Sequence, residues 1–234
     1  MTQKFDPVKE RLLDAALNHV VFDGWSDATF NASIQDTGTD VAVAKMACPR
    51  GAVDLAIAYH LRGDALMVAR YENEDLSALR YSEKIAALVR FRMEAVSDKE
   101  AVRRGTTLFA LPQHAGDGAK LIWGTADAIW NALGDTSRDS NWYSKRATLS
   151  AVYSATVLFW LGDTSEDHAD TWAFLDRRIE NVMQFEKVKA QANASPLLKP
   201  LLAGPKWALS LLKVPPESAR NDLPGHCSGT SENS

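Results

Sequence analysis

The chain has 234 residues, a hydrophobic content of 46% and a formal net charge of -4. This length and content allow a sizeable core, whereas the slight excess of acids gives no general attraction for nucleic acid. The two cysteines, Cys48 and Cys227, are too few for a disulfide framework. The sequence predicts a globular protein of a reducing compartment, without a signal or transit peptide in residues 1–10 and without an apolar run that could cross a membrane.

Apolar residues recur at helical spacing along almost the whole chain, and no segment alternates convincingly at the strand period. We therefore predict an all-α fold. A turn at Gly38 and an N-cap at Asp40 separate two short helices near the N-terminus, and Ser97 with Glu100 is expected to form a capping box. The predicted helices span about 8–24, 30–37, 41–47, 51–69, 79–96, 97–112, 118–133, 139–161 and, after a cap within 163–165, a ninth to residue 183.

This helix order predicts four regions. Residues 1–60 form a helix-turn-helix-like unit of three helices, as in TetR-type repressors, and residues 61–186 form a larger helical ligand-binding body. Residues 187–214 form a basic amphipathic helix that contacts a membrane or a partner. Residues 215–234, rich in Ser, Gly and Asn, are expected to be disordered.

The charge of the N-terminal unit argues against DNA binding. Residues 1–60 contain five basic and eight acidic side chains, giving -3, whereas a DNA-binding unit normally carries the opposite sign. The helix over 41–47 offers one long polar side chain, Lys45, for reading base edges. We expect a unit kept for packing or dimerisation, and a transcriptional regulator that senses a hydrophobic effector stays as the alternative.

No familiar catalytic or metal-binding motif is present. The sequence lacks Glu-x-x-His pairs for two irons, a zinc His-Glu-x-x-His helix, a nucleophile elbow and the glycine-rich phosphate loops. The five histidines are scattered in a way that is more typical of capping and packing than of a metal site. We assign no catalytic residue, metal or cofactor, and an enzyme is the weakest alternative.

The segment from Leu149 to Leu161 would be apolar on every side of a helix, and such a helix must be surrounded. Large aromatic residues are dense on the segments around it, which favours a ligand-sized apolar cavity among the helices over 118–133, 139–161 and 163–183. A central helix in a solid core is an equally open alternative. The candidate lipid-contacting residues are Trp123, Trp130, Leu149, Tyr153, Phe159, Trp160 and Trp172.

The segment over 187–213 carries five lysines and no acid in an acidic protein. Its basic, Trp-bearing, amphipathic pattern is typical of a helix that lies on an anionic bilayer, although packing on the body or on a dimer partner remains the alternative. The candidate membrane-binding residues are Lys199, Leu201, Leu202, Lys206, Trp207, Leu211, Leu212 and Lys213.

Three motifs carry a resemblance to a known family. They are Leu-Pro-Gln-His at 111–114, Asp-x-Asn-Trp-Tyr-x-x-Arg at 139–146 and Asp-Thr-Trp-x-Phe-Leu at 170–175. Over residues 111–183 the chain resembles the accessory proteins of ubiquinone biosynthesis, a family with a TetR-like fold that binds lipid. The Pro-interrupted stretch over 196–205 departs from the smoother last helix of that family.

The resemblance implies a homodimeric, non-catalytic protein, peripheral on the inner membrane of a bacterial cytoplasm. Such a protein would take isoprenylated quinone intermediates from the membrane and present them to the diiron hydroxylase that acts on demethoxyubiquinone, without binding nucleic acid. The residues that the resemblance assigns to the partner surface are Ile129, Asp139, Trp142, Tyr143, Arg146 and Leu158.

Overall fold

The structure is a computed structural model that describes residues 6–96, 98–137 and 140–194, and for residues 185–194 it describes the backbone alone. Helices account for all the regular structure in these ranges, which confirms the all-α prediction. Their bounds are α1 (Pro7–Asp23), α2 (Asp27–Thr37), α3 (Val41–Ala47), α4 (Ala52–Asn73), α5 (Tyr81–Glu94), α6 (Lys99–Ala110), α7 (Ala115–Ala132), α8 (Ser140–Gly162), a 3₁₀ turn (Glu166–His168) and α9 (Ala169–Ala194).

Side-chain caps explain where the N-terminal helices begin and end. The Asp6 carboxylate accepts the N–H of Val8 at the start of α1, and Asp40 accepts the N–H groups of Ala42 and Val43 at the start of α3. Gly38 ends α2 with φ 60°, a left-handed conformation that glycine adopts without steric cost. The predicted turn at Gly38 and cap at Asp40 are confirmed.

Two predicted details differ from the structure. The N-cap of α6 is Asp98, whose carboxylate accepts the Glu100 N–H at 2.7 Å, so the predicted capping box beginning at Ser97 is wrong. The Asp98 carboxylate lies at the N-terminus of the helix, where the helix dipole favours negative charge. The ninth helix begins later than expected, at Ala169, because Asp167 and His168 have positive φ and end a separate 3₁₀ turn.

The helices enclose two apolar clusters. The first lies under α1, α2, α3 and the start of α4, and the second lies among α5, α7, α8, α9 and the end of α4. Helix α4 contributes Leu55 to the first cluster and Met67 to the second, so the predicted domain boundary at residue 60 falls inside one continuous helix. The same helix therefore ties the helix-turn-helix-like unit to the body.

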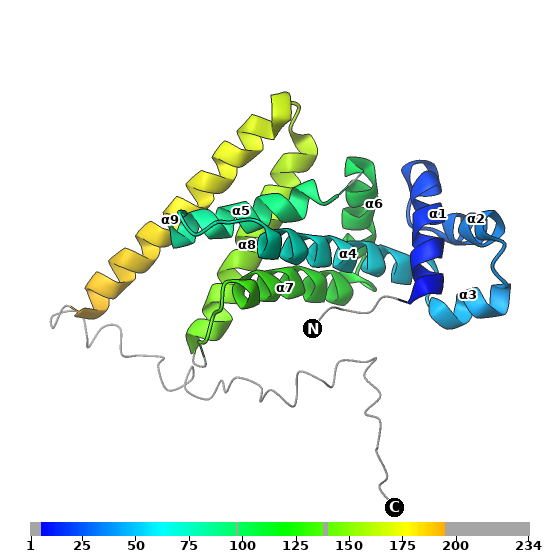
Figure 1. Ribbon diagram of the computed structural model, residues 1–234, viewed down its shortest axis with the longest axis horizontal. Coiled ribbons are helices and arrows are strands. Elements are labelled where there is room, and N and C mark those ends of the chain that lie inside the picture. The colour runs from blue at the N-terminus through cyan, green and yellow to red at the C-terminus, as the bar shows by residue number, and fades with distance from the viewer. Residues whose placement is uncertain (1–5, 97, 138–139, 195–234) are drawn as a thin grey trace, which may run out of the picture.

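The arrangement is elongated, with the N-terminal unit at one end and α9 extending beyond the body at the other (Figure 1). Helices α4 and α7 run side by side through the middle, α8 packs on α7, and α9 packs on α8 and α5. No helix in the described part of the chain is both long enough and apolar enough to span a bilayer.

A buried ion pair lies in the interface of α4 and α5. Arg92 is 3% exposed, and its Nε donates to Asp64 Oδ1 at 2.5 Å. Gly63 makes room for the guanidinium, since a Cβ at this position would lie 2.5 Å from Arg92 Nη1. A side chain at position 63 would have to displace a charged group that has no other place in the core.

We predict that Gly63→Ala lowers the free energy of unfolding by about 1–3 kcal/mol, the usual cost of overpacking. Gly124→Ala is the matched control, because Gly124 also lies inside a helix but a Cβ there meets nothing within 4 Å. The control should gain stability from the higher helix propensity of alanine. Urea unfolding measures both variants, and equal stability of the two would contradict the argument.

Candidate functional site

A cavity of about 430 Å³ lies where the two apolar clusters meet, and we call it the first cavity. Small residues create the space, because alanine and glycine face it where larger side chains would fill it. Gly118 also allows α7 to approach α6, since a Cβ there would lie 2.8 Å from Phe109 Cβ. The small lining residues are Ala56, Ala101, Gly105, Ala110, Ala115, Gly118, Ala119 and Ser154.

The first cavity has an apolar mouth and an aromatic lining. Its exposed lining residues are Ala110, Ala115, Ala119 and Leu158, so it opens between the end of α6, the start of α7, and α8. Leu158 is 61% exposed, which is unusual for a leucine that also lines a cavity. The large side chains inside are Trp25, Tyr59, Met93, Phe109, Ile122, Tyr153 and Trp160. Its volume is in the range of sites that hold small ligands.

A polar cluster forms one part of the wall of the first cavity. His60 and Arg92 line it, and Thr125 and Asp64 connect them through hydrogen bonds. The His60 Nε2 lies 2.8 Å from Thr125 Oγ1, which also lies 2.9 Å from Asp64 Oδ1. One proton arrangement satisfies both contacts: the imidazole donates to the hydroxyl, and the hydroxyl donates to the carboxylate.

Burial keeps the His60 imidazole neutral. The pKa of His60 is lowered from 6.5 to about 4, chiefly by desolvation and also by the nearby Arg92 guanidinium, which together outweigh the opposing effect of the Asp64 carboxylate. Burial likewise raises the pKa of the Tyr153 hydroxyl, which therefore stays protonated. The cluster thus presents neutral groups and one paired guanidinium to the cavity.

The structure contains a second cavity of about 390 Å³ between α5, α7, α8 and α9. We call it the second cavity; its lining residues are Tyr81, Ile85, Trp130, Asn141, Ser144, Lys145, Thr148, Leu149, Val152, Ile179, Val182 and Met183. This is the region in which the sequence predicted a cavity, among the seventh to ninth helices. The first cavity, shared by α4, α6, α7 and α8, was not anticipated.

The candidate lipid-contacting residues are divided between these places. Tyr153 and Trp160 line the first cavity, and Trp130 and Leu149 line the second. Trp123 packs against Trp142, Phe159 stacks on Phe174 at 4.6 Å between ring centroids, and Trp172 donates its indole N–H to the Asp167 carbonyl oxygen. These last three side chains line neither cavity, and the lipid contacts of all seven stay predictions.

The candidate partner-binding residues also differ in accessibility. Ile129 and Arg146 are fully buried, and Trp142 is 7% exposed. Tyr143 is half-buried in an aromatic group with Trp123 and Trp142, whereas Leu158 lies apart from it at the mouth of the first cavity. Asp139 and all the candidate membrane-binding residues lie outside the described residues.

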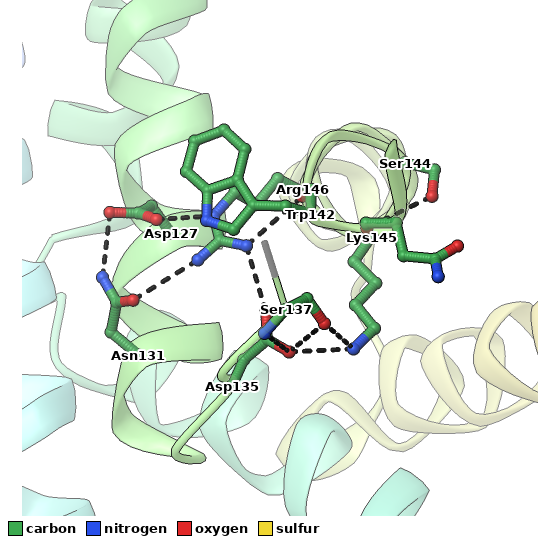
Figure 2. A network of polar contacts seen from close by, with 9 residues as sticks. Asp127, Asn131, Asp135, Ser137, Trp142, Ser144, Lys145 and Arg146 are labelled. Carbon is green, nitrogen blue, oxygen red and sulfur yellow. Dashed lines mark hydrogen bonds and ion pairs between the residues drawn. The ribbon is translucent and has the colours of Figure 1, made fainter. Parts of the chain in front are cut away.

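Arg146 organises a polar network at the start of α8 (Figure 2). Its Nε donates to Asp127 Oδ1 at 2.5 Å and its Nη1 to Asp135 Oδ2 at 3.1 Å, while its guanidinium carbon lies 4.0 Å from the Trp142 ring centroid. Lys145 donates to the other Asp135 oxygen at 2.8 Å. The network joins α7, the following turn and α8. Because the Arg146 guanidinium lies over the Trp142 ring, the network also holds that ring in position.

The two basic side chains keep Asp135 ionised. Burial alone would raise its pKa, but hydrogen bonds from Lys145, Ser137 and Arg146 lower the pKa of Asp135 to about 2. A fully buried arginine paired in this way positions its neighbours and has no exposed surface of its own. Within the described residues, no three His, Cys, Asp or Glu side chains gather closely enough to hold a metal ion.

Several site residues were missed by the sequence reasoning. Trp25, Tyr59 and Phe109 line the first cavity, but Tyr59 and Phe109 follow the period of their helices as ordinary core residues would, and Trp25 lies in the short connection between α1 and α2. The sequence feature that could have identified the cavity is the set of small residues on two consecutive helices, between Gly105 and Ala119. Small residues that face each other across helices leave space. The sequence around His60 did not identify it as a site residue. Thr125 lies far from it along the chain, and Asp64 lies one helical turn away.

We predict that His60 makes the protein acid-sensitive. The unfolded chain binds a proton near pH 6.5, whereas folded His60 does so only near pH 4. Stability is therefore full above pH 6.5 and is lost as the pH falls toward 4, by about 2 kcal/mol between pH 7 and pH 5. Urea unfolding at both pH values should show a smaller loss for His60→Gln. The control is His19→Gln, whose exposed ring contacts Asp36; equal pH dependence of His60→Gln and wild type would refute the assignment.

Comparisons with known proteins agree with this architecture. Residues 115–186 match the COQ9 family model. The protein from Rattus norvegicus named "Ubiquinone biosynthesis protein COQ9, mitochondrial" is 30% identical over 199 residues, covering 81% of this chain and 63% of the rat protein. The Drosophila melanogaster protein of the same name is 29% identical over 193 residues, covering 80% and 59%. The chain thus spans less than two thirds of the length of these relatives.

A solved structure shows the fold. The TetR transcriptional regulator from Nitrosomonas europaea matches with a TM-score of 0.62 over 75% of this chain and 97% of that chain, at 19% sequence identity. The fold is therefore TetR-like, as predicted, although an identity this low carries no function. The family model falls on the segment that contains α7, α8 and most of α9 and bears the Asn-Trp-Tyr motif, whereas the relatives match about four fifths of the chain. The chain is thus similar to the COQ9 proteins of ubiquinone biosynthesis, both in this segment and over most of its length.

Proposed function

We propose that the chain is a non-catalytic lipid-binding accessory protein of ubiquinone biosynthesis. It takes an isoprenylated quinone intermediate from a membrane and presents it to the diiron demethoxyubiquinone hydroxylase. The observation that carries the proposal is the first cavity, a ligand-sized apolar space with an apolar mouth. The names of the relatives supply the pathway.

The chemistry of the first cavity suits such a ligand. Most of its wall is apolar and aromatic, which favours a prenyl chain because burial of apolar surface drives binding. The polar cluster of His60 and Arg92 is the part of the wall where the oxygen atoms of a ring can be accommodated. The cavity is small beside a long isoprenoid, so the rest of the chain leaves through the mouth beside Leu158.

The same proposal includes contacts with a membrane, with the hydroxylase and with a second copy of the chain. The lysine-rich segment over 187–213 supplies attraction for anionic lipid, at about 1 kcal/mol per lysine near the surface. The aromatic group of Trp123, Trp142 and Tyr143 supplies the anchor for the hydroxylase. We place the protein at the inner face of a bacterial membrane, as a homodimer.

The DNA-binding alternative receives little support from the third helix. Helix α3 exposes Val41, Val43 and Met46, at 53%, 43% and 82%, where a DNA-reading helix would present hydrogen-bonding side chains. The net charge of -3 over residues 1–60 repels phosphate. A gel shift with the chromosomal region around its own gene would have to be positive to restore this alternative.

We predict that Ala119→Trp lowers the affinity for ubiquinone with two isoprene units at least tenfold. Ala119 is exposed at the mouth of the first cavity, and an indole there blocks entry. The matched control is Ala147→Trp, on the exposed face of α8 and away from both cavities, which should bind as wild type. Equilibrium dialysis measures the affinity, and native mass spectrometry reports co-purified lipid. A wild-type protein that neither carries nor binds an isoprenoid would refute the proposed function.

The partner surface gives a separate prediction. Tyr143→Ala should weaken binding to the demethoxyubiquinone hydroxylase by about 1–2 kcal/mol, because an aromatic anchor loses its contact area. Met46→Ala is the control, since Met46 is a highly exposed apolar residue at the far end of the protein. Surface plasmon resonance with both variants at equal folding stability measures the difference. If the two variants bind alike, the aromatic group is not the anchor.

A further inference from the structure

The second cavity has no role in the function proposed above. It lies between α5, α7, α8 and α9, and its floor is apolar, with Ile85, Leu149 and Ile179 all less than one tenth exposed. Its rim carries polar side chains, among them Ser144 and Thr148 on α8. An apolar pocket with a few polar groups is the usual form of a small-molecule site.

One polar atom of this cavity lacks a partner. The Trp130 side chain lines the cavity and the residue is 8% exposed, yet its indole Nε1 has no hydrogen-bond acceptor among the described residues. An indole N–H is only a donor, and a buried donor without an acceptor costs free energy. The cavity therefore favours a ligand that brings an acceptor oxygen to Trp130.

The charges around the cavity select an uncharged acceptor. Lys145 lines the cavity, but its Nζ is already bonded to Asp135 at 2.8 Å and to Ser137 at 2.8 Å. Asp135 is also paired with Arg146. Because each charge here has a counter-charge within the protein, an incoming anion would have to break a pair, whereas a neutral carbonyl would not.

Aromatic rings at the opening favour a ring-shaped ligand. Tyr81 lies with its ring centroid 6.0 Å from that of Trp130 and is 46% exposed, so it stands at the rim. The Lys145 ammonium lies 5.2 Å from the Trp130 ring centroid, on the face of the indole. A flat ligand can pack between these side chains and the aliphatic floor.

We propose that the second cavity is a distinct binding site for an uncharged, planar, conjugated cyclic carbonyl compound with a short apolar substituent, whose carbonyl oxygen accepts the Trp130 indole N–H. Quinone rings belong to this class. The site is separate from the first cavity, so the two can be filled or blocked independently.

The experiment uses the full chain with Ala119→Trp, in which the first cavity is blocked. The probe is a 1,4-benzoquinone with one five-carbon prenyl chain, and the comparison probe is a prenyl-substituted xylene of the same shape without carbonyl groups. Equilibrium dialysis measures the affinities. The ¹⁵N–¹H resonance of the Trp130 indole, identified by its absence from Trp130→Phe, reports the hydrogen bond.

The quinone should shift the Trp130 resonance and bind about fivefold more tightly than the xylene, the factor that one hydrogen bond contributes. Trp130→Phe should abolish this preference, and Thr148→Trp, at the half-buried rim, should abolish binding of both probes. An unmoved resonance, equal affinity for the two probes, or binding that survives Thr148→Trp would each overturn the proposal. The outcome is separable from the proposed function, because loss of isoprenoid binding in the first cavity leaves these readouts unchanged.

Discussion

The ion pair between Arg92 and Asp64 is the constraint on which the arrangement of the body depends. Two opposite charges in a core are tolerated only if they meet each other and their remaining hydrogen-bonding groups are satisfied. Asp64 therefore fixes α4 against Arg92 on α5, and Thr125 brings α7 to the same carboxylate. These contacts hold α4, α5 and α7 together at one polar point. The neighbouring helices therefore cannot shift inward to fill the space beside it, and the first cavity persists.

The cavity follows from this constraint together with residue size. Around the polar point the lining changes from large side chains, such as Tyr153 and Trp160, to the small residues of α6 and the start of α7. Small residues in a helix interface normally bring helices closer together, as Gly118 does beside Phe109. Ala115 and Ala119, which flank Gly118 on α7, line the first cavity, and the volume that larger side chains would fill there remains as open space with an apolar mouth.

The sequence predicted the elements much better than the site. Period and caps are local properties, so α3 and α8 were placed almost to the residue, and Asp40 and Gly38 act as expected. A cavity depends on which small residues face each other across helices, and no local pattern encodes that pairing. For this reason the aromatic residues chosen as lipid contacts are divided between two cavities and the outer surface.

Arg146 shows a second limit of sequence reasoning. A shared motif identifies a residue that matters to a family, but it does not tell whether the side chain faces a partner or supports the residues that do. A charged residue next to Trp142 and Tyr143 suggests an exposed position, whereas two carboxylates supplied by residues 127 and 135 made full burial possible. The second carboxylate lies in the turn after α7, and its contribution depends on how that turn folds back.

The helix-turn-helix-like unit has the geometry of the TetR fold, but the exposed side chains of α3 are apolar. Its three helices share an apolar cluster and the fold of a TetR regulator, yet the face that such a regulator turns to DNA carries apolar side chains here. The same unit also supplies Trp25 to the first cavity, and the Trp25 indole donates to the Ala101 carbonyl on α6 at 3.1 Å. The unit therefore forms part of the cavity wall as well as an apolar cluster of its own.

Helix α8 connects the two places that the proposed function uses. It carries Trp142 and Tyr143 near its start and Leu158, at the mouth of the first cavity, sixteen and fifteen residues later. At 1.5 Å per residue, the two places are about 24 Å apart on one rigid element. The Arg146 network fixes the first place relative to α7, and α7 also forms one side of the mouth. A protein that docks on the aromatic group is therefore held at a defined distance and direction from the opening, which is the geometric requirement for passing a ligand from one protein to another.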